Sequence, residues 1–474
     1  MRAAQLAAVT ALVLAAGAAP ARASSPPGAA PAAARTLVVS THGSDSAPGT
    51  ASRPLRTIQA AVDRLRSGGR VEVRGGAYHQ RVRLVAVHGV TLSPYRHEHV
   101  TISGAGRTPP PGLTALVEIA DSSGVTVSGL DLTAYWSTRL GVVPAGVYVH
   151  GHDRGVTVSG NHVHDLGNTN GILGSFDINA HGIAVYGDDP HGPVTGLSIR
   201  DNVVDHLRLG ASETVVVNGN VDGWAITGNR IEDDDNIGID AIGFEPTLTG
   251  AYRYTTANRA RNGVIAGNQI SRIQSRGNPA YWEGGTGAAA WCNCADGIYV
   301  DGGTHILISG NRVQDSDIGI EVAAENPHGS ADHVVVRANR VTGSLFTGIT
   351  TGGYCNGTQA CGGVRTGTSH DNLFEDNWLR GNNRLDDGSP ELLVQYYASD
   401  DTFRRNTIIA TNSAHVVYGT VPGGTEHGNR SDHNLFRVAA GGPGSAQFGW
   451  SGHTYTGFAA YRRATGQDAH STIS

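Results

Sequence analysis

Lysine is absent from the 474-residue chain, methionine occurs once and cysteine four times. All 35 residues counted as Lys or Arg are therefore arginine, which excludes a lysine general base or a Schiff-base lysine. The arginines are scattered along the chain, and the formal net charge is -6. Because nucleic-acid binding proteins concentrate basic residues on one surface, we expect no nucleic-acid partner.

Apolar runs long enough to cross a membrane are also missing, since a span needs about 20 apolar residues. The longest apolar stretch lies near the N terminus and is followed by Ala21 and Ala23, at the spacing that a signal peptidase accepts. We therefore expect a signal peptide at residues 1–23, a secreted, extracellular protein and no membrane contact. Residues 24–35, rich in Pro and Ala, predict a disordered leader before the folded part, residues 36–474.

The four cysteines form two close pairs, Cys292 with Cys294 and Cys355 with Cys361. In an exported protein such cysteines indicate disulfides, and a zinc site is disfavoured because the compartment is oxidising. A bridge within Cys-x-Cys is strained, so we expect pairing between the two segments. A local bridge between Cys355 and Cys361 is the alternative.

Glycine is abundant, with 66 residues, and much of it belongs to a repeat. The segment VTVSGNHVHDLG, residues 156–167, returns in related forms such as WAITGNRIEDDDNIG and ILISGNRVQDSDIG. Each copy predicts a short strand, a polar turn centred on Asn and a second strand, and stacked Asn side chains can hydrogen-bond from copy to copy. The turn residues are Asn161, Asn202, Asn229, Asn268, Asn311, Asn339, Asn377 and Asn406.

Repeat units of this size with alternating strands can bury an apolar face only by stacking. The predicted fold class is all-β: a single-stranded right-handed parallel β-helix. The amphipathic segment 54–69, with Thr57 as its N-cap, predicts a helix that caps the first coil. Residues 446–474 are expected to cover the last coil.

Longer stretches resemble a known family. The opening VSTHGSDSAPGTASRPLRTIQAAVDRLRSGGRVEVRGGAYHQRV, the serial SGN turns and the closing ATGQDAHS are similar to the secreted right-handed parallel β-helix proteins of the polysaccharide-active superfamily. The resemblance covers nearly all of the mature chain. It implies a secreted carbohydrate-active enzyme but leaves the reaction open, because the superfamily contains pectate and alginate lyases, epimerases and glycosidases.

The spacing of the turn asparagines indicates where loops are inserted. Four intervals exceed the spacing of about 28 residues expected of such repeat units, and the extra residues are 167–180, 244–261, 274–295 and 354–371. These insertions flank the Gly-Ile-x strands that follow most copies, so we expect two walls with those strands as the floor of a groove. Flat aromatic side chains in the walls suit a sugar surface. The wall aromatics are Trp282, Trp291, Tyr281, Tyr252 and Tyr254.

In the pattern Gly-Ile-x-Val-x the two x side chains point to solvent. Asp240, Asp301 and Glu321 take these positions on three successive coils, which puts the Cβ atoms of neighbouring acids about 8 Å apart. Carboxyls roughly 6.5 to 9.5 Å apart suit an inverting glycosidase. We predict these three as the catalytic residues, with Asp301 as general acid and Asp240 or Glu321 as base. The alternatives are solubilising surface acids and a calcium site.

Other outward or strand-entry side chains of the floor are predicted to contact the sugar together with two wall tryptophans. These substrate-binding candidates are Tyr299, Asp296, His181, Glu213, Tyr186, His150, Trp282 and Trp291. Asp296, just before its strand, would orient a substrate hydroxyl or cap the loop. We assign no metal ligand.

The predicted function is inverting hydrolysis of a polysaccharide or oligosaccharide by a monomer that needs no cofactor. A lyase or epimerase acting on an acidic polysaccharide is the alternative, and it would use His181, Tyr299 and Arg259 or Arg261, with calcium as its cofactor. A non-catalytic glycan-binding or cell-surface scaffold is the second alternative. The clustered insertions disfavour the scaffold, because a coil that only stacks needs no walls.

Overall fold

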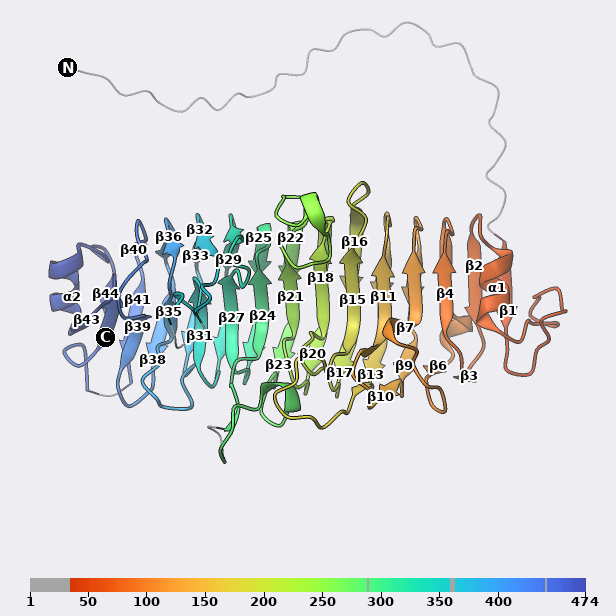
Figure 1. The fold of residues 1–474 in the computed structure, drawn as a ribbon, viewed down its shortest axis with the longest axis horizontal. Helices are drawn as coiled ribbons and strands as arrows, with labels where there is room; N and C mark the ends of the chain where they lie inside the picture. The colour runs from red at the N-terminus through yellow and green to blue at the C-terminus, as the bar shows by residue number, and fades with distance from the viewer. Residues whose placement is uncertain (1–34, 288–289, 359–362, 440) are drawn as a thin grey trace, which may run out of the picture. The chain divides into compact units, whose positions relative to one another are not determined.

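The computed structural model describes residues 35–287, 290–358, 363–439 and 441–474, and within them the chain winds into a parallel β-helix (Figure 1). Most coils contribute one strand to each of three long parallel sheets, here called sheets I, II and III. This arrangement confirms the all-β fold of stacked parallel strands predicted from the repeat. The predicted signal peptide and all of the predicted leader except Arg35 lie outside the described residues.

Sheet I consists of β1 (Thr36–Val39), β2 (Gly69–Val73), β5 (Val90–Pro94), β8 (Thr126–Ser128), β12 (Thr157–Ser159), β16 (Val194–Arg200), β19 (Val221–Thr227), β22 (Arg261–Ala266), β25 (Thr304–Ser309), β29 (Val335–Arg337), β33 (Leu373–Glu375), β37 (Thr402–Arg404), β40 (Arg430–Asp432) and the flanking β28 (Ser330–Asp332), β32 (Thr368–His370) and β36 (Ala398–Ser399). Sheet II consists of β4 (Val82–Val85), β7 (Gly112–Ala120), β11 (Val142–His150), β15 (His181–Gly187), β18 (Val215–Gly219), β21 (Ile239–Ile242), β24 (Asp296–Asp301), β27 (Ile318–Ala323), β31 (Thr347–Thr351), β35 (Leu392–Val394), β39 (Val416–Thr420), β42 (Gln447–Trp450) and β43 (His453–Thr456). Sheet III consists of β3 (Gly76–Tyr78), β6 (Val100–Ser103), β9 (Asp131–Thr133), β13 (His162–His164), β17 (Val203–Asp205), β20 (Arg230–Glu232), β23 (Gln269–Ser271), β26 (Arg312–Gln314), β30 (Arg340–Thr342), β34 (Trp378–Arg380), β38 (Thr407–Ala410), β41 (Leu435–Val438) and β44 (Thr472–Ile473). The remaining elements are the strand pair β10 (Trp136–Ser137) and β14 (Gly167–Asn168), the helices α1 (Ile58–Arg64) and α2 (Phe458–Thr465), and the 3-10 turns η1 (Tyr95–His97), η2 (Gly250–Tyr252) and η3 (Pro279–Tyr281).

The turn between sheets I and III carries the predicted asparagine ladder, which the structure confirms. At Asn268, Nδ2 donates to Asn311 Oδ1 and to the Ile226 carbonyl, both at 3.0 Å. Its Oδ1 accepts the backbone N–H of Asn229 at 2.9 Å and the Asn229 Nδ2 at 3.0 Å. The amide-to-amide bond recurs along the ladder from Asn161 to Asn434. Buried amides thus satisfy the polar groups of each turn and hold neighbouring coils in register.

Replacing Asn268 by Ala is expected to lower the free energy of unfolding by about 3 kcal/mol, because buried donors on Asn229 lose their acceptor and each such group costs about 1–3 kcal/mol. Chemical denaturation measures the change. The control is Gln269→Ala, since Gln269 directly follows Asn268 at the start of β23 and is exposed. Equal losses in both variants would contradict a structural role for the ladder.

The strands of sheet II repeat Gly-Ile because the coils approach closely at the glycine. A Cβ at Gly319 would lie 2.3 Å from the Gly348 carbonyl oxygen and 2.3 Å from the Val341 side chain. The strand pairing aligns Asp240 with Tyr299 and Tyr299 with Glu321. The predicted register of these positions is therefore confirmed, but the expectation that the side chains reach solvent is wrong: Asp240, Tyr299 and Glu321 are only 2%, 3% and 5% exposed.

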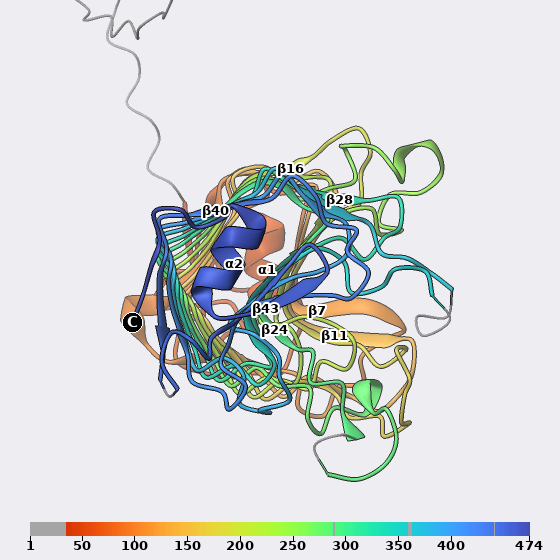
Figure 2. The same cartoon turned by 90° about the vertical axis from the view of Figure 1, so that its left-hand side faces the viewer.

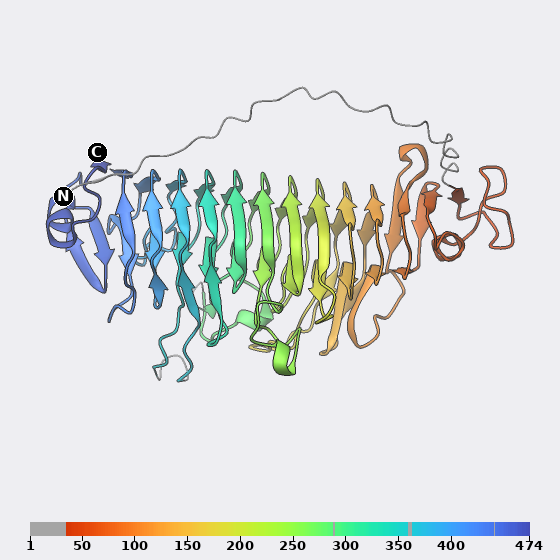
Figure 3. The same ribbon diagram turned by 90° about the horizontal axis from the view of Figure 1, so that it is seen from above.

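Each end of the coil carries a short helix (Figure 3). Helix α1 begins after Thr57, whose hydroxyl accepts the N–H of Ala60 at 3.2 Å, and it buries Ile58 and Val62. Near the other end, the Tyr461 ring of α2 stacks on Phe448 of β42, with ring centroids 4.6 Å apart. Viewed along the coil axis, long loops project from one side, beside β11 and β24 (Figure 2).

The cysteines correct one expectation. Cys292 and Cys294 are bonded to each other, with Cα atoms 5.2 Å apart, so the predicted bridge between the two segments is wrong. The intervening Asn293 has a φ of 54°, a left-handed conformation that Asn tolerates and that curls the chain locally. The alternative bridge involves Cys361, which lies outside the described residues.

The described part of the chain contains no helix that is both long and apolar enough to cross a membrane.

Candidate active site

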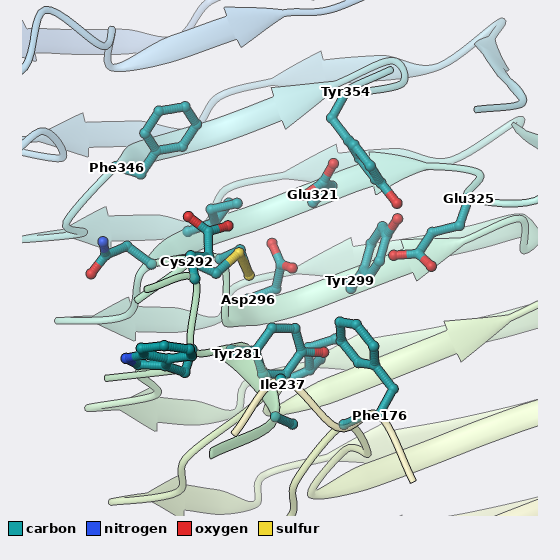
Figure 4. Close-up of a pocket in the computed structure, with 18 of the residues that line it drawn as sticks. Phe176, Ile237, Tyr281, Cys292, Asp296, Tyr299, Glu321, Glu325, Phe346 and Tyr354 are labelled. Atoms are coloured by element: carbon teal, nitrogen blue, oxygen red, sulfur yellow. A yellow bond between two sulfur atoms is a disulfide. The ribbon is translucent and has the colours of Figure 1, made fainter. Parts of the chain in front are cut away.

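A pocket of about 880 Å³ lies on sheet II around β24 and β27 (Figure 4). Three of the four predicted insertions supply wall residues: Phe176 from the first, Tyr281 and Trp282 from the third, and Tyr354 from the fourth. The second insertion, 244–261, supplies none of the lining residues that the structure describes. The predicted groove is thus a pocket over two floor strands, with the third insertion as its largest wall.

The wall that carries Tyr281 and Trp282 is held by Asn278, the N-cap of η3. The buried Asn278 amide donates to the Gly210 carbonyl at 2.7 Å and to the Asp235 carbonyl at 2.8 Å, and its oxygen accepts the Ala280 N–H at 3.0 Å. These bonds tie the insertion to the two preceding coils. The wall is therefore anchored from beneath and its aromatic rings are held at the pocket.

Two carboxyls meet at the floor of the pocket, Asp296 at the start of β24 and Glu321 in β27. Their side chains belong to residues only 2% and 5% exposed. Burial raises the pKa of Asp296 well above its ordinary value, and the adjacent Glu321 charge raises it further. Burial also raises the pKa of Glu321, to about 8. A hydrogen bond from Asp296 to Glu321 joins the two groups, so the pair holds a proton at neutral pH.

Glu325 is the third carboxyl of the pocket and lies just beyond β27. In Figure 4 its carboxyl faces the hydroxyl ends of Tyr299 and Tyr354. Burial raises the pKa of Glu325 and a hydrogen bond from Tyr354 lowers it, while water reaches the side chain, which is exposed. Solvent screening weakens the effect of burial, so Glu325 ionises more readily than Asp296 or Glu321.

The other two predicted catalytic acids, Asp240 and Asp301, do not line the pocket. Asp301 Oδ1 accepts the backbone N–H of Glu325 at 2.6 Å, which fixes the start of the segment that carries Glu325. Asp240 is buried, and its Oδ1 has no hydrogen-bond partner. Burial, followed by the charge of Glu213, raises the pKa of Asp240 well above its ordinary value. Both acids are therefore placed outside the pocket lining.

Four predicted sugar contacts lie on earlier coils, outside the described pocket lining. The His181 and Tyr186 rings of β15 pack together at 5.9 Å, and burial lowers the pKa of His181 to about 4. Burial raises the pKa of the neighbouring Glu213 to about 8, so these two groups are neutral together at pH 7. His150 of β11 instead lies 3.5 Å from Glu118. These residues organise the floor next to the pocket.

The predicted wall aromatics divide into two groups. Trp282, at 36% exposure, and Tyr281 line the pocket. Trp291 pairs with Trp282 through a backbone bridge but does not line the pocket. Tyr252 and Tyr254 stand on the second insertion, beside His rings and away from the lining. One predicted tryptophan is therefore placed to contact a ligand.

Cationic side chains are missing from the pocket lining that the structure describes, which contains no Arg, Lys or His. The arginines considered for lyase chemistry are engaged elsewhere: Arg259 pairs with Asp332 at 2.6 Å and Arg261 with Asp222 at 3.1 Å. Among the described residues, three sets of His and Asp side chains lie close enough together to hold a metal ion. They are Asp131–His162–His164, His305–Asp332–His333 and Asp432–His433–His470.

Glu325, Tyr354 and Gln395 line the pocket but were not identified from the sequence. Glu325 stands four residues after Glu321, and Tyr354 stands three residues after the end of β31, as the first residue of the fourth insertion. Both residues could therefore have been identified from their position close to a predicted floor strand. Gln395 follows β35, two coils from β27, and carries no comparable signal.

Comparisons with known proteins give one relative over nearly the whole chain. No family model matches. YwoF of Bacillus subtilis strain 168, described as uncharacterized, is 34% identical over 440 residues, which cover 92% of this chain and 86% of YwoF. Pectate lyase PEL9 of Emericella nidulans is 31% identical over 122 residues, which cover 24% of this chain and 30% of PEL9.

Among solved structures, the GH136 lacto-N-biosidase of Eubacterium ramulus superposes with a TM-score of 0.50 at 13% identity, covering 93% of this chain and 67% of that chain. At this identity the likeness shows the fold alone. The parallel β-helix fold that the resemblance implied is confirmed.

Proposed function

Since the chain belongs to the family of YwoF from Bacillus subtilis, we propose its function from the chemistry of the pocket: hydrolysis of glycosidic bonds in a polysaccharide or oligosaccharide. The observation that carries the proposal is a buried, hydrogen-bonded carboxyl pair facing a more readily ionised carboxyl in one aromatic-walled pocket. Glycosidases need one protonated and one ionised carboxyl at the scissile bond. Carbohydrate-active relatives support the same conclusion.

In the proposed reaction Asp296 is the general acid. Its carboxyl proton passes to the glycosidic oxygen as the bond from that oxygen to the anomeric carbon breaks. Glu321 accepts a hydrogen bond from Asp296 and keeps it protonated before the reaction, because two adjacent carboxylates repel each other. Glu321 is thus a positioning residue for Asp296.

Glu325 is the proposed general base. It takes a proton from water as the water oxygen attacks the anomeric carbon, so one water is consumed and the anomeric configuration inverts. Asp296 and Glu325 flank Tyr299 in Figure 4, and water reaches the exposed Glu325 side chain. This assignment replaces the sequence-based one, in which Asp301 was the acid.

We also propose that the protein is exported from the cell. The Cys292–Cys294 disulfide is typical of an oxidising compartment. A polysaccharide substrate is also met outside the cell. Measuring the protein in culture supernatant, with and without residues 1–23, tests this point.

The experiment that tests the reaction is a screen of neutral, acidic and amine-bearing polysaccharides for new reducing ends and for the ultraviolet absorbance of unsaturated sugars. Hydrolysis gives reducing ends alone, and proton NMR of the first product should show the inverted anomer. Elimination gives both signals and would establish the lyase alternative. A binding scaffold gives neither signal.

Replacing Trp282 by Ala is expected to raise KM by about tenfold with little change in kcat, because a stacking surface acts in the ground state and transition state alike. Steady-state kinetics on the substrate found in the screen measure both constants. Trp136→Ala is the matched control, since Trp136 is equally exposed, at 37%, on β10 outside the pocket lining. A KM unchanged by the Trp282 replacement would assign Trp282 to loop anchoring.

A further inference from the structure

The pocket is more acidic than hydrolysis requires. Its described lining contains Glu283, Asp296, Glu321 and Glu325 and no cationic side chain. The buried Asp301 stands behind Glu325. Two carboxyls suffice for glycoside hydrolysis, and a cation that enters the pocket would allow the further carboxyls to ionise.

Three lining residues have buried acceptors that lack donors. Gln395 Oε1 has no hydrogen-bond partner, and Asp296 Oδ1 and Glu321 Oε1 have none besides the carboxyl proton that the pair shares; these residues are only 6%, 2% and 5% exposed. All three line the pocket. Buried acceptors need donors, and a protonated amine supplies three donors and no acceptor, as the ammonium of lysine does.

The aromatic walls distinguish an organic ammonium from a metal ion. Tyr281, Tyr299, Tyr354 and Trp282 all line the pocket, and ring faces attract ammonium groups and the C–H faces of sugars. Calcium takes six to eight oxygen ligands and gains nothing from such rings. A sugar with a carboxylate or sulfate would be repelled, because no lining cation neutralises it.

We infer that the pocket selects a sugar that carries a free, protonated amine, that is, a hexosamine unit without its N-acetyl group. The inference rests on the proposed function, because it names the substrate class of the same site. The amine sits among the acceptors of Asp296, Glu321 and Gln395, and the pyranose face lies against the wall aromatics. An N-acetylated or simple hydroxyl substituent carries no charge, so it would give these carboxyls no counter-ion.

The test compares ligands that differ only at one substituent. Glucosamine hexamers are titrated calorimetrically against the intact protein beside the N-acetylglucosamine and glucose hexamers of the same linkage, and galactosamine is titrated beside N-acetylgalactosamine and galactose. Close charge pairs in desolvated sites give large couplings, so the amine ligand of at least one series should bind about tenfold tighter or more. Absence of an amine preference in both series overturns the inference.

Variants distinguish binding in the pocket from general electrostatic attraction of a cationic ligand to a protein of net charge -6. Glu321→Gln and Glu325→Gln should each reduce the amine preference, while Asp177→Asn, an exposed acid outside the pocket lining, should retain it. A preference that survives both glutamine variants, or calcium that binds these acids and abolishes amine binding, overturns the inference. Cleavage of neutral polysaccharides without amine preference would support the proposed hydrolysis and contradict the amine selectivity. Amine-selective binding without any cleavage would support the selectivity and contradict the hydrolysis.

Discussion

Asp296→Asn is expected to lower kcat by about 100-fold or more, because general acid catalysis contributes about 10²–10⁴-fold and an amide has no proton to give. Asparagine keeps the shape and can still donate a hydrogen bond to Glu321, so folding should be preserved. In Glu321→Gln and Glu325→Gln, kcat is expected to fall by similar factors. Steady-state kinetics on the substrate from the screen, with circular dichroism spectra of each variant, measure the effect.

The controls distinguish the pocket from the row of acids predicted from the sequence. Asp177→Asn removes an exposed acid from the first insertion and should leave kcat unchanged. Asp240→Asn removes a buried acid that does not line the pocket, so kcat should fall less in this variant than in Asp296→Asn. The reverse order would restore the sequence-based assignment. Activity lost through calcium, and regained on adding it, would favour the lyase alternative.

The fold was accessible from the sequence because it is periodic. Each copy repeats the same alternation and the same turn Asn, so one hydrogen-bond scheme, such as that of Asn268, applies at every rung. The same periodicity gave the register that aligns Tyr299 with Glu321. Strand positions could therefore be ranked without coordinates, and Glu321 was identified as a pocket acid in this way.

The rest of the site depends on segments without a period. Tyr354 and Phe176 stand on insertions whose paths are set by tertiary contacts such as those of Asn278, and these contacts join residues far apart in the chain. Asp296 was identified as a sugar contact but not as an acid, because the sequence does not show that Glu321 pairs with it. The disulfide between Cys292 and Cys294 was not predicted, because the spacing of the cysteines does not show that Asn293 adopts a left-handed backbone conformation.

Stability should depend on pH in an unusual direction. Burial raises the pKa of Glu213, Glu321 and Asp401 to about 8 and that of Glu391 to about 7. In the unfolded chain Asp and Glu titrate near pH 4. The folded protein therefore binds more protons than the unfolded chain across the interval between these values, and its free energy of unfolding decreases as the pH rises through that interval.

Calorimetry is therefore expected to show a melting temperature higher by several degrees at pH 5 than at pH 8. Acids with lowered pKa values do not obscure the trend: the hydrogen bond from His150 helps to hold the pKa of Glu118 at about 2, so its stabilising charge is lost only in more acidic solution. Glu213→Gln removes one raised group and should flatten the dependence. A melting temperature that is constant or rises toward pH 8 would mean that these carboxyls ionise without penalty. The buried acids around the pocket would then carry full negative charge in the free protein.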